Sequence, residues 1–172
     1  MISMIWHKWS GLLIIAVLLL SLIPGIAQAA TTSAVTVTVQ PILISIVNAP
    51  TTYGFGSIAM AGTPTTTAGY FTITNTSGGT AINLSVYADN FTGGVGWALA
   101  SNASPGTNIA GMYAGIVSGT FNTVVTVSPG NVLKSGLSAS TNQTWHLKLM
   151  APTEYTDAVL KTTTVTVSAA AT

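Results

Sequence analysis

Apolar and polar residues alternate strictly near the start of the chain, and the phase of this alternation changes at one residue. Val35, Val37 and Val39 share one parity, while threonines and a glutamine take the other. This period of two is typical of a strand with one buried face. From Pro41 onward the phase is reversed, and residues 42–47 are apolar on both faces. Because proline gives no N–H to a ladder, Pro41 marks a sheet edge, a bulge or a crossing point.

Two interpretations explain the reversal, because a straight strand cannot serve both patterns. In the first, residues 42–47 belong to the subunit's own sheet and are buried on both sides. Residues 34–40 then project and complete a neighbour's sheet, as a donor strand carried by Val35, Val37, Val39 and Pro41. In the second, a bulge interrupts one ordinary strand. The first interpretation is the one developed below.

Later segments show strand patterns separated by turn residues. Strands are predicted at residues 53–58, with Tyr53 and Phe55 on one face, and at 70–74, 80–88, 97–100, 120–127, 145–149 and 161–169. Residues 132–143 predict a loop or an edge strand. Residues 101–119 lack a clean period and predict a long loop with a helical turn near residues 112–116. The sequence TVTVS at residues 164–168 repeats the TVTV of residues 36–39, so these two half-buried strands are natural neighbours in a sheet, in one molecule or between two.

About eight short strands at regular spacing predict an all-β fold. We expect a single β-sandwich of the jelly-roll kind, with an immunoglobulin-like sandwich as the alternative. The expected organisation is a signal peptide at residues 1–29, the donor strand at 30–41 and the sandwich at 42–172. The signal peptide has a short basic region, an apolar run over residues 12–23 and an A-x-A site ending at Ala29. That apolar run is shorter than the ~20 residues a membrane-spanning helix needs.

Charge is scarce in the chain that would follow cleavage. Of the 4 Lys and 3 acidic residues in the whole sequence, one lysine lies in the signal peptide, so 3 − 3 leaves a net charge of zero. No basic patch is available for nucleic acid. A near-neutral surface favours association, which suits a protein that assembles.

The sequence has no cysteine, so export is not accompanied by disulfide bonds. Sugar is another way to stabilise an exported domain, and the chain offers five N-x-S/T sequons. The candidate N-glycosylation sites are Asn75, Asn83, Asn90, Asn102 and Asn142. The alternation of residues 82–87 places Asn83 on the solvent face of its strand.

The sequence predicts no catalytic residue, no metal site and no cofactor. The acidic residues Glu154 and Asp157 share one polar loop and are best explained as solvated charges. His146 is the one histidine after the signal peptide and takes the exposed parity of its strand, without an obvious partner base. One histidine without cysteine cannot close a zinc site.

Several sequence features together resemble the archaeal bundling pili and thread subunits. The features are the leader ending in A-Q-A, the Thr/Val strand after it, the Phe55-Gly56-Ser57 step, the turn at residues 73–79 and the closing segments 145–149 and 161–167. Those pili are similar in turn to the TasA and camelysin family of bacterial biofilm fibres. The resemblance implies a jelly-roll subunit whose N-terminal strand inserts into the next subunit, and a filament that bundles in biofilm. It brings no catalytic residue.

We therefore expect a secreted filament subunit on the cell surface, not an enzyme. Its partners would be identical subunits, neighbouring filaments in lateral contact and N-linked glycans. The alternative is a monomeric secreted carbohydrate-binding or S-layer-associated adhesin module, which would use Trp97 or Trp145 to stack on sugar rings.

Overall fold

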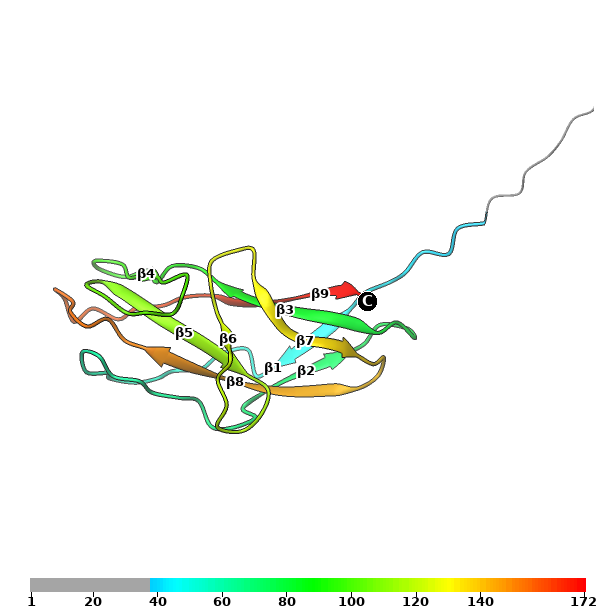
Figure 1. The fold of residues 1–172 in the computed structure, drawn as a ribbon, viewed down its shortest axis with the longest axis horizontal. Coiled ribbons are helices and arrows are strands. Elements are labelled where there is room, and N and C mark those ends of the chain that lie inside the picture. The colour runs from blue at the N-terminus through cyan, green and yellow to red at the C-terminus, as the bar shows by residue number, and fades with distance from the viewer. Residues whose placement is uncertain (1–37) are drawn as a thin grey trace, which may run out of the picture. The chain divides into compact units, whose positions relative to one another are not determined.

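The computed structural model describes residues 38–172, and residues 41–172 form one compact unit (Figure 1). The predicted signal peptide, Val35 and Val37 lie outside the described residues. The described part is all-β, with nine strands and no helix. The strands are β1 (Ile46–Ala49), β2 (Phe71–Asn75), β3 (Ile82–Ala88), β4 (Ala98–Leu99), β5 (Ile109–Gly115), β6 (Thr123–Val124), β7 (Asn131–Leu137), β8 (Asn142–Met150) and β9 (Val165–Ala171).

The strands form two sheets. The larger sheet has the order β1-β2-β8-β5-β4, with β6 pairing β5 as well, and the smaller sheet has the order β7-β3-β9. All pairs are antiparallel except β4 with β5. Buried side chains of both sheets meet in one apolar cluster, which is consistent with a β-sandwich.

Four of the predicted strands are confirmed, and each directs alternate side chains towards the core. β2 and β3 alternate between buried and half-buried positions along their whole length. In β8, Trp145, Leu147 and Leu149 turn into the core as expected. β9 places Val165 and Val167 on its core side, opposite buried residues of β3.

The prediction of a long loop with a helical turn at residues 101–119 is wrong, because β5 lies there. β5 pairs with β8 along five residues and is buried at most positions. Its small residues hid the strand pattern, and packing requires them. A Cβ on Gly111 would lie 2.1 Å from Ala103 O, and one on Gly115 would lie 1.8 Å from Thr120 O. Loops cross β5 so closely that no side chain fits at these two positions.

The start of the domain also differs from the prediction. Residues 42–47 are not buried on both faces, since Ile42, Leu43 and Val47 are 63%, 76% and 54% exposed. Ile44 and Ile46 are the ones that pack against the core. The predicted strand at residues 53–58 is absent, although Tyr53 and Phe55 do share one face with ring centroids 4.9 Å apart.

Strand structure at residues 120–127 is limited to β6. The short hairpin before it, residues 117–121, covers the outer face of β8 and buries His146 to 1% exposure. The imidazole Nε2 lies 3.2 Å from Thr120 O, and the Phe121 ring packs edge-on against it at 4.7 Å. The expectation that His146 is exposed is therefore wrong, because a loop replaces solvent on that face.

The sandwich has two ends, which we call proximal and distal. At the proximal end, the turn at residues 76–81 contacts both terminal strands. The first N–H of this turn donates to Ser45 O at 2.9 Å, and Thr172 N–H donates to its last carbonyl at 3.2 Å. β1 therefore begins and β9 finishes at the same end. The distal end carries the loop 91–97 and the segment 155–163, from which β9 begins.

Candidate functional site

One edge of β9 has no partner strand within residues 38–172. On its other edge, Asp89 N–H donates to Thr164 O and Thr172 N–H donates to Ala81 O. The hydrogen-bonded pairs with β3 therefore involve the even-numbered residues of β9. In an antiparallel ladder the intervening residues direct their N–H and C=O groups to the opposite edge. Val165, Val167 and Ala169 therefore present a row of unpaired backbone groups that another strand could use.

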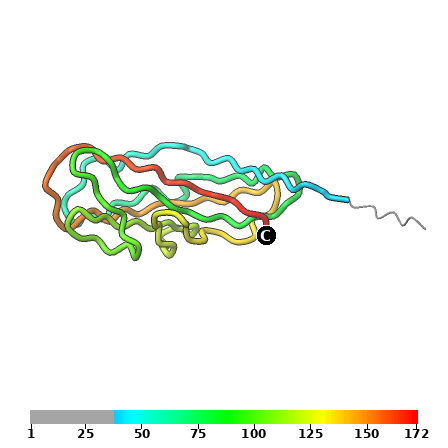
Figure 2. Tube along the Cα trace, turned by 90° about the horizontal axis from the view of Figure 1, so that it is seen from above, coloured from blue at the N-terminus to red at the C-terminus, as the bar shows by residue number. Residues whose placement is uncertain are grey.

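The side chains of the same three residues face the core and are only partly buried. Ile44 and Ile46, at the edge of the larger sheet, are likewise half-buried against the core. Figures 1 and 2 show β1 and β9 along the same side of the domain, and no ladder joins them within the described residues. We call this side, made by Ile44, Ile46, Val165, Val167 and Ala169, the open side.

A cavity of about 1000 Å³ continues the open side towards the distal end. Its floor is apolar and belongs mainly to the larger sheet, with Phe71, Met112, Trp145, Leu147 and Leu149. Its rim is formed by two chain segments, residues 51–58 and 157–163. The floor residues are at most 5% exposed, so most of the accessible surface of the cavity belongs to its rim.

Aromatic rings line this cavity. Trp145 stacks on Phe71 with centroids 4.7 Å apart, and its indole N–H donates to Asn48 Oδ1 at 2.9 Å. Tyr53 and Tyr70 meet edge-on at 4.8 Å above them, and each is 37% exposed. This ladder of rings leads from the surface into the core.

Trp97 contributes an unpaired polar group to the cavity wall. The residue is 7% exposed, and its indole N–H has no hydrogen-bond partner within the described residues. Phe91 and Tyr155 hold the ring, with centroids 5.7 and 5.5 Å away. An unsatisfied buried donor costs about 1–3 kcal/mol.

An ion pair fixes the cavity rim at the distal end. Lys161 Nζ donates to Gly93 O at 2.6 Å, to Val95 O at 2.7 Å and to Asp157 Oδ1 at 2.5 Å. Asp157 Oδ2 accepts from Val95 N–H at 2.5 Å. The hydrogen bond from Lys161 lowers the pKa of Asp157 below its ordinary value of 3.8, and the Val95 N–H acts in the same direction. These bonds hold segment 157–161 against the loop 91–97, so the rim keeps its form without an occupant.

The other outer edge of the smaller sheet, on β7, is protected against pairing. Lys134 lies in the middle of β7, and the register with β3 shifts twice beside it. Gly136 has a φ of +64° and bends the strand near its end. A charge and a bulge are common means of blocking an edge strand. β9 has neither, since residues 165–171 hold only valine, threonine, serine and alanine.

The predicted donor residues fall partly within the described part. Val39 is 82% exposed, and Pro41 is exposed at the start of the compact unit. The acceptor residues of β9 had a sequence signal of their own, the repeated TVTV pattern. The aromatic cavity had none, because its residues come from segments far apart in the sequence.

The five candidate glycosylation sites differ in accessibility. Asn75 is 0% exposed, and its amide is fully used. Nδ2 donates to Thr80 O and Leu137 O, both at 2.9 Å, and Oδ1 accepts from Ser77 N–H at 3.0 Å. The folded domain therefore has no room for a glycan at Asn75, which instead ties the 75–80 turn to β7.

The other four sequons are more accessible. Asn83 is half-buried on the outer face of the smaller sheet, and its Oδ1 accepts from Gly136 N–H. Asn90, Asn102 and Asn142 are exposed. A glycan on any of these three would extend into solvent.

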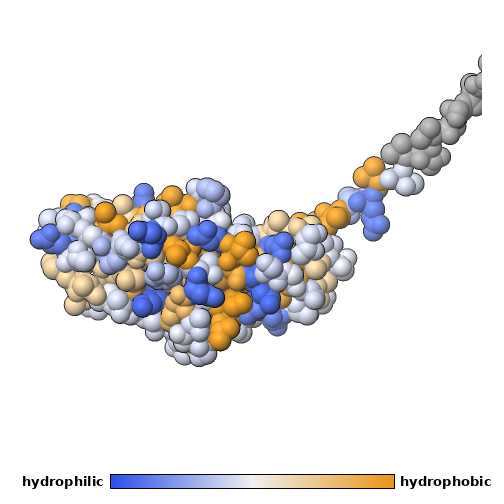
Figure 3. Space-filling view, in the orientation of Figure 1, coloured by the Kyte–Doolittle hydropathy of each residue, from blue (hydrophilic) through white to orange (hydrophobic). Residues whose placement is uncertain are grey.

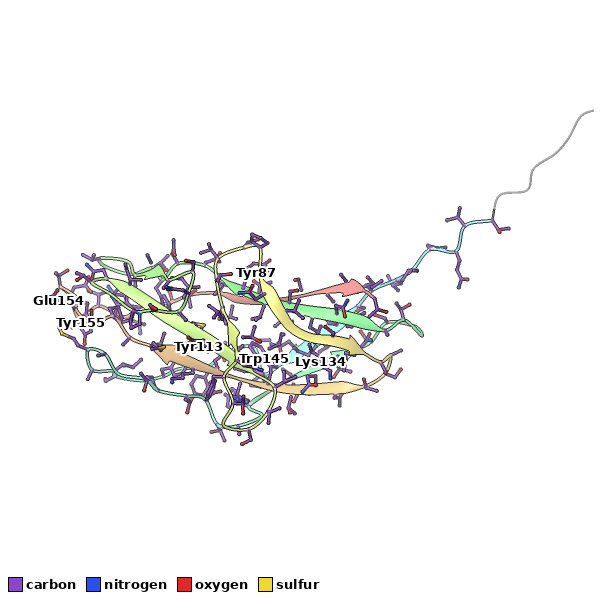
Figure 4. The ribbon with its side chains drawn as sticks, in the orientation of Figure 1. Tyr87, Tyr113, Lys134, Trp145, Glu154 and Tyr155 are labelled. Atoms are coloured by element: carbon purple, nitrogen blue, oxygen red, sulfur yellow. The ribbon has the colours of Figure 1, made fainter. Side chains whose placement is uncertain are left out.

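The two acidic residues of the distal polar loop, Glu154 and Asp157, both have hydrogen-bond partners. Figure 4 shows Glu154 at the distal end, where it is exposed and bonds the Thr107 hydroxyl at 3.1 Å. Asp157 is held by Lys161 as described, so the loop pair does not form two free carboxylates. Within residues 38–172, no group of three His, Cys, Asp or Glu residues lies close enough to hold a metal ion.

The two tryptophans of the adhesin alternative are both buried. Trp97 is 7% and Trp145 is 2% exposed, so neither presents a flat ring to a sugar at the surface. In Figure 4 Trp145 lies within the sandwich.

Comparisons with models of protein families, with curated proteins and with solved structures found no match to this chain. A search of the described residues for a helix long and apolar enough to cross a membrane found none.

Proposed function

We propose that the protein is a secreted structural subunit of an extracellular filament. In this filament the arm of each subunit, residues 30–41, inserts as a donor strand into the open side of the next. The observation that carries the proposal is the bare edge of β9. Its backbone groups and half-buried side chains lack a partner within residues 38–172, while a matching Thr/Val sequence pattern precedes the domain.

An inserted arm would supply what the open side lacks. Its backbone would pair with the free N–H and C=O groups of Val165, Val167 and Ala169. Its valines at positions 35, 37 and 39 share one face and would cover the exposed part of the core. Full burial of a valine side chain is worth about 1.5–3 kcal/mol. A donor strand of seven residues extends about 23 Å, which matches the seven residues of β9.

The direction of the arm follows from the chain. The arm is joined to β1, which begins at the proximal end. In a head-to-tail row this end meets the distal end of the next subunit, where β9 begins. The arm then runs antiparallel to β9. Matching the two TVTV segments puts Val39 opposite Val165 and Val37 opposite Val167, and the ladder stops at Pro41, which has no N–H.

A contact between an arm and a groove joins two different surfaces, so it repeats without closing. The protected edge of β7 disfavours pairing of an incoming strand on that side of the smaller sheet. Each subunit then has one donor and one acceptor, and an unbranched filament results.

The proposal extends to the filament's surroundings. The chain after the signal peptide has no net charge, so filaments can lie side by side in biofilm without repulsion. Figure 3 shows an apolar stripe across the middle of one face of the domain. Exposed valines between β6 and β7 and at the start of β7 include Val127 and Val132, which are 45% and 57% exposed. This stripe is where we place the lateral contacts. N-linked glycans on Asn90, Asn102 or Asn142, and jelly-roll connectivity, complete the proposal.

The proposal is tested on protein secreted by cells that express the full chain. Val37→Asp puts a charge on the inserted face of the arm, and Thr36→Asp puts the same charge on its outer face. We expect Val37→Asp to abolish filaments seen by negative-stain microscopy and to release secreted monomer, whereas Thr36→Asp keeps them.

Deletion of residues 31–40 provides the second arm of the test. The truncated chain should be secreted and monomeric, and a synthetic peptide of residues 31–40 should bind it. Equal behaviour of the two aspartate variants, or a wild-type protein that is monomeric and binds glycans, would refute the filament function. The second result would favour the carbohydrate-binding alternative.

A further inference from the structure

Two large apolar side chains lie on the surface directly after the arm. Ile42 and Leu43 are 63% and 76% exposed, although they precede residues that pack into the core. Exposed apolar residues are ordinary when they stand singly, but two adjacent ones at the junction with a proposed donor strand call for a partner. Within the described residues the fold gives them none.

The distal cavity has the properties of their partner. It holds about 1000 Å³ between apolar and aromatic walls, and the deeper part is lined by Phe91 and Trp97. Val159 and Leu160 on its rim are 53% and 80% exposed, so they too gain by being covered. No charged group in the cavity is free, because Lys161 and Asp157 bond each other and the backbone of the loop 91–97.

The two features lie at opposite ends of the sandwich. Ile42 and Leu43 lead into β1 at the proximal end, and the cavity opens at the distal end. A subunit therefore cannot fill its own cavity with these residues, but a head-to-tail neighbour can. We infer that Ile42 and Leu43 of one subunit plug the distal cavity of the next, beyond the end of the donor-strand ladder. This inference rests on the proposed filament.

The register supports this placement. With Val39 opposite Val165, the residues that follow Pro41 pass the segment 161–163 on the cavity rim. Adjacent residues of an extended chain point to opposite sides, and Leu43 has the parity of Val39, whose side chain faces the core in this register.

The first test replaces the two plug residues and measures assembly. The double variant Ile42→Ser with Leu43→Ser keeps the arm intact and removes exposed side chains, so the fold is unaffected. We expect the subunit concentration needed for filaments to rise about 10- to 100-fold, since one or two large apolar side chains lose their burial. The matched control, Val47→Ser, removes a valine of β1 that is 54% exposed and should change this concentration less than threefold.

The second test uses the absence of native cysteine. Secreted Leu43→Cys protein is mixed with secreted Leu160→Cys protein under mild oxidation. Subunit contact at the cavity should give disulfide-linked dimers on a non-reducing gel, and a mixture of Leu43→Cys with Val47→Cys should give none.

The outcomes separate the two proposals. Wild-type filaments whose formation is unaffected by the double serine variant, together with no Leu43–Leu160 crosslink, would overturn the plug and leave the donor strand standing. A wild-type protein without filaments would overturn both. Loss of assembly in the double variant together with the specific crosslink supports the plug.

Discussion

Val167 is the residue of β9 at which a charged substitution should weaken the proposed subunit contact most. It lies in the middle of β9, faces the core opposite Val86 of β3 and is half-buried in the single subunit. In the assembled filament it would be enclosed by the arm. A charge here should therefore be tolerated by the subunit and not by the filament.

The magnitude follows from the two environments. In the subunit, the stem of a lysine can lie along the apolar surface with its ammonium in water, so Val167→Lys should cost about 1 kcal/mol or less. In the filament, the variant loses the remaining half of the valine burial, about 1 kcal/mol. It also encloses an ammonium without a counter-charge, which costs several kcal/mol. A total of about 4 kcal/mol weakens the subunit contact roughly a thousandfold.

The assay compares Val167→Lys with Ser168→Lys, which adds the same charge to the exposed outer face of the same strand. Sedimentation of secreted protein over a range of concentrations gives the fraction in filaments. Thermal unfolding of the soluble fraction should show less than about 5 °C of change for both variants. We expect Val167→Lys to stay in the supernatant and Ser168→Lys to sediment like wild type. Filaments of normal stability from Val167→Lys would show that the open side of β9 is not the acceptor.

Three further predictions concern the subunit itself. Asn75→Ala removes three hydrogen bonds of a buried side chain and should lower the free energy of unfolding, measured by urea denaturation, by about 2–4 kcal/mol. The control Asn102→Ala, in an exposed turn, should lower it by less than about 1 kcal/mol. Equal effects of the two variants would contradict the structural role of Asn75. Because folding lowers the pKa of Asp157, the stability that this carboxylate contributes is complete above pH 3.8 and is lost as the pH falls through its folded value. Thermal scans from pH 7 to pH 2 should show that loss in wild type, reduced in Asp157→Asn, and identical curves would refute it. Gly115→Ala drives a methyl group towards Thr120 O and should cost about 1–3 kcal/mol, while Gly54→Ala meets no atom within 4 Å and should be neutral by the same urea measurement.

Alternation of side chains predicted the strands that have one face in the core and one face near solvent. β2, β3 and β9 follow this rule, and β8 follows it except at His146. β5 does not, because loops cross it so closely at Gly111 and Gly115 that no side chain fits there. A strand of small residues leaves no periodic hydrophobic signal in the sequence. The prediction that His146 is exposed was wrong for a related reason. Alternation treats the second face of a strand as solvent-exposed, whereas the hairpin 117–121 covers this face of β8.

The candidate site was predictable only in its local part. The TVTV patterns indicated two similar half-buried strands before their places were known. The cavity was not predictable, because it depends on how segments 51–58 and 157–163 pack and on the Lys161–Asp157 pair, which holds the second segment against the loop 91–97. The exposure of Ile42 was missed because apolar composition alone does not say whether a residue meets its own core or that of another molecule.

The start of the domain and the cavity lie at opposite ends of the sandwich, which has a consequence for the proposed fibre. Its two tips would be chemically different: one would display an unengaged arm, and the other an empty apolar slot. The slot-bearing tip is the one that needs shielding, since bare β edges invite indiscriminate association. A fibre of this design therefore calls for a terminal cap that carries a strand and lacks a slot, and the first molecule laid down decides the polarity of all that follow.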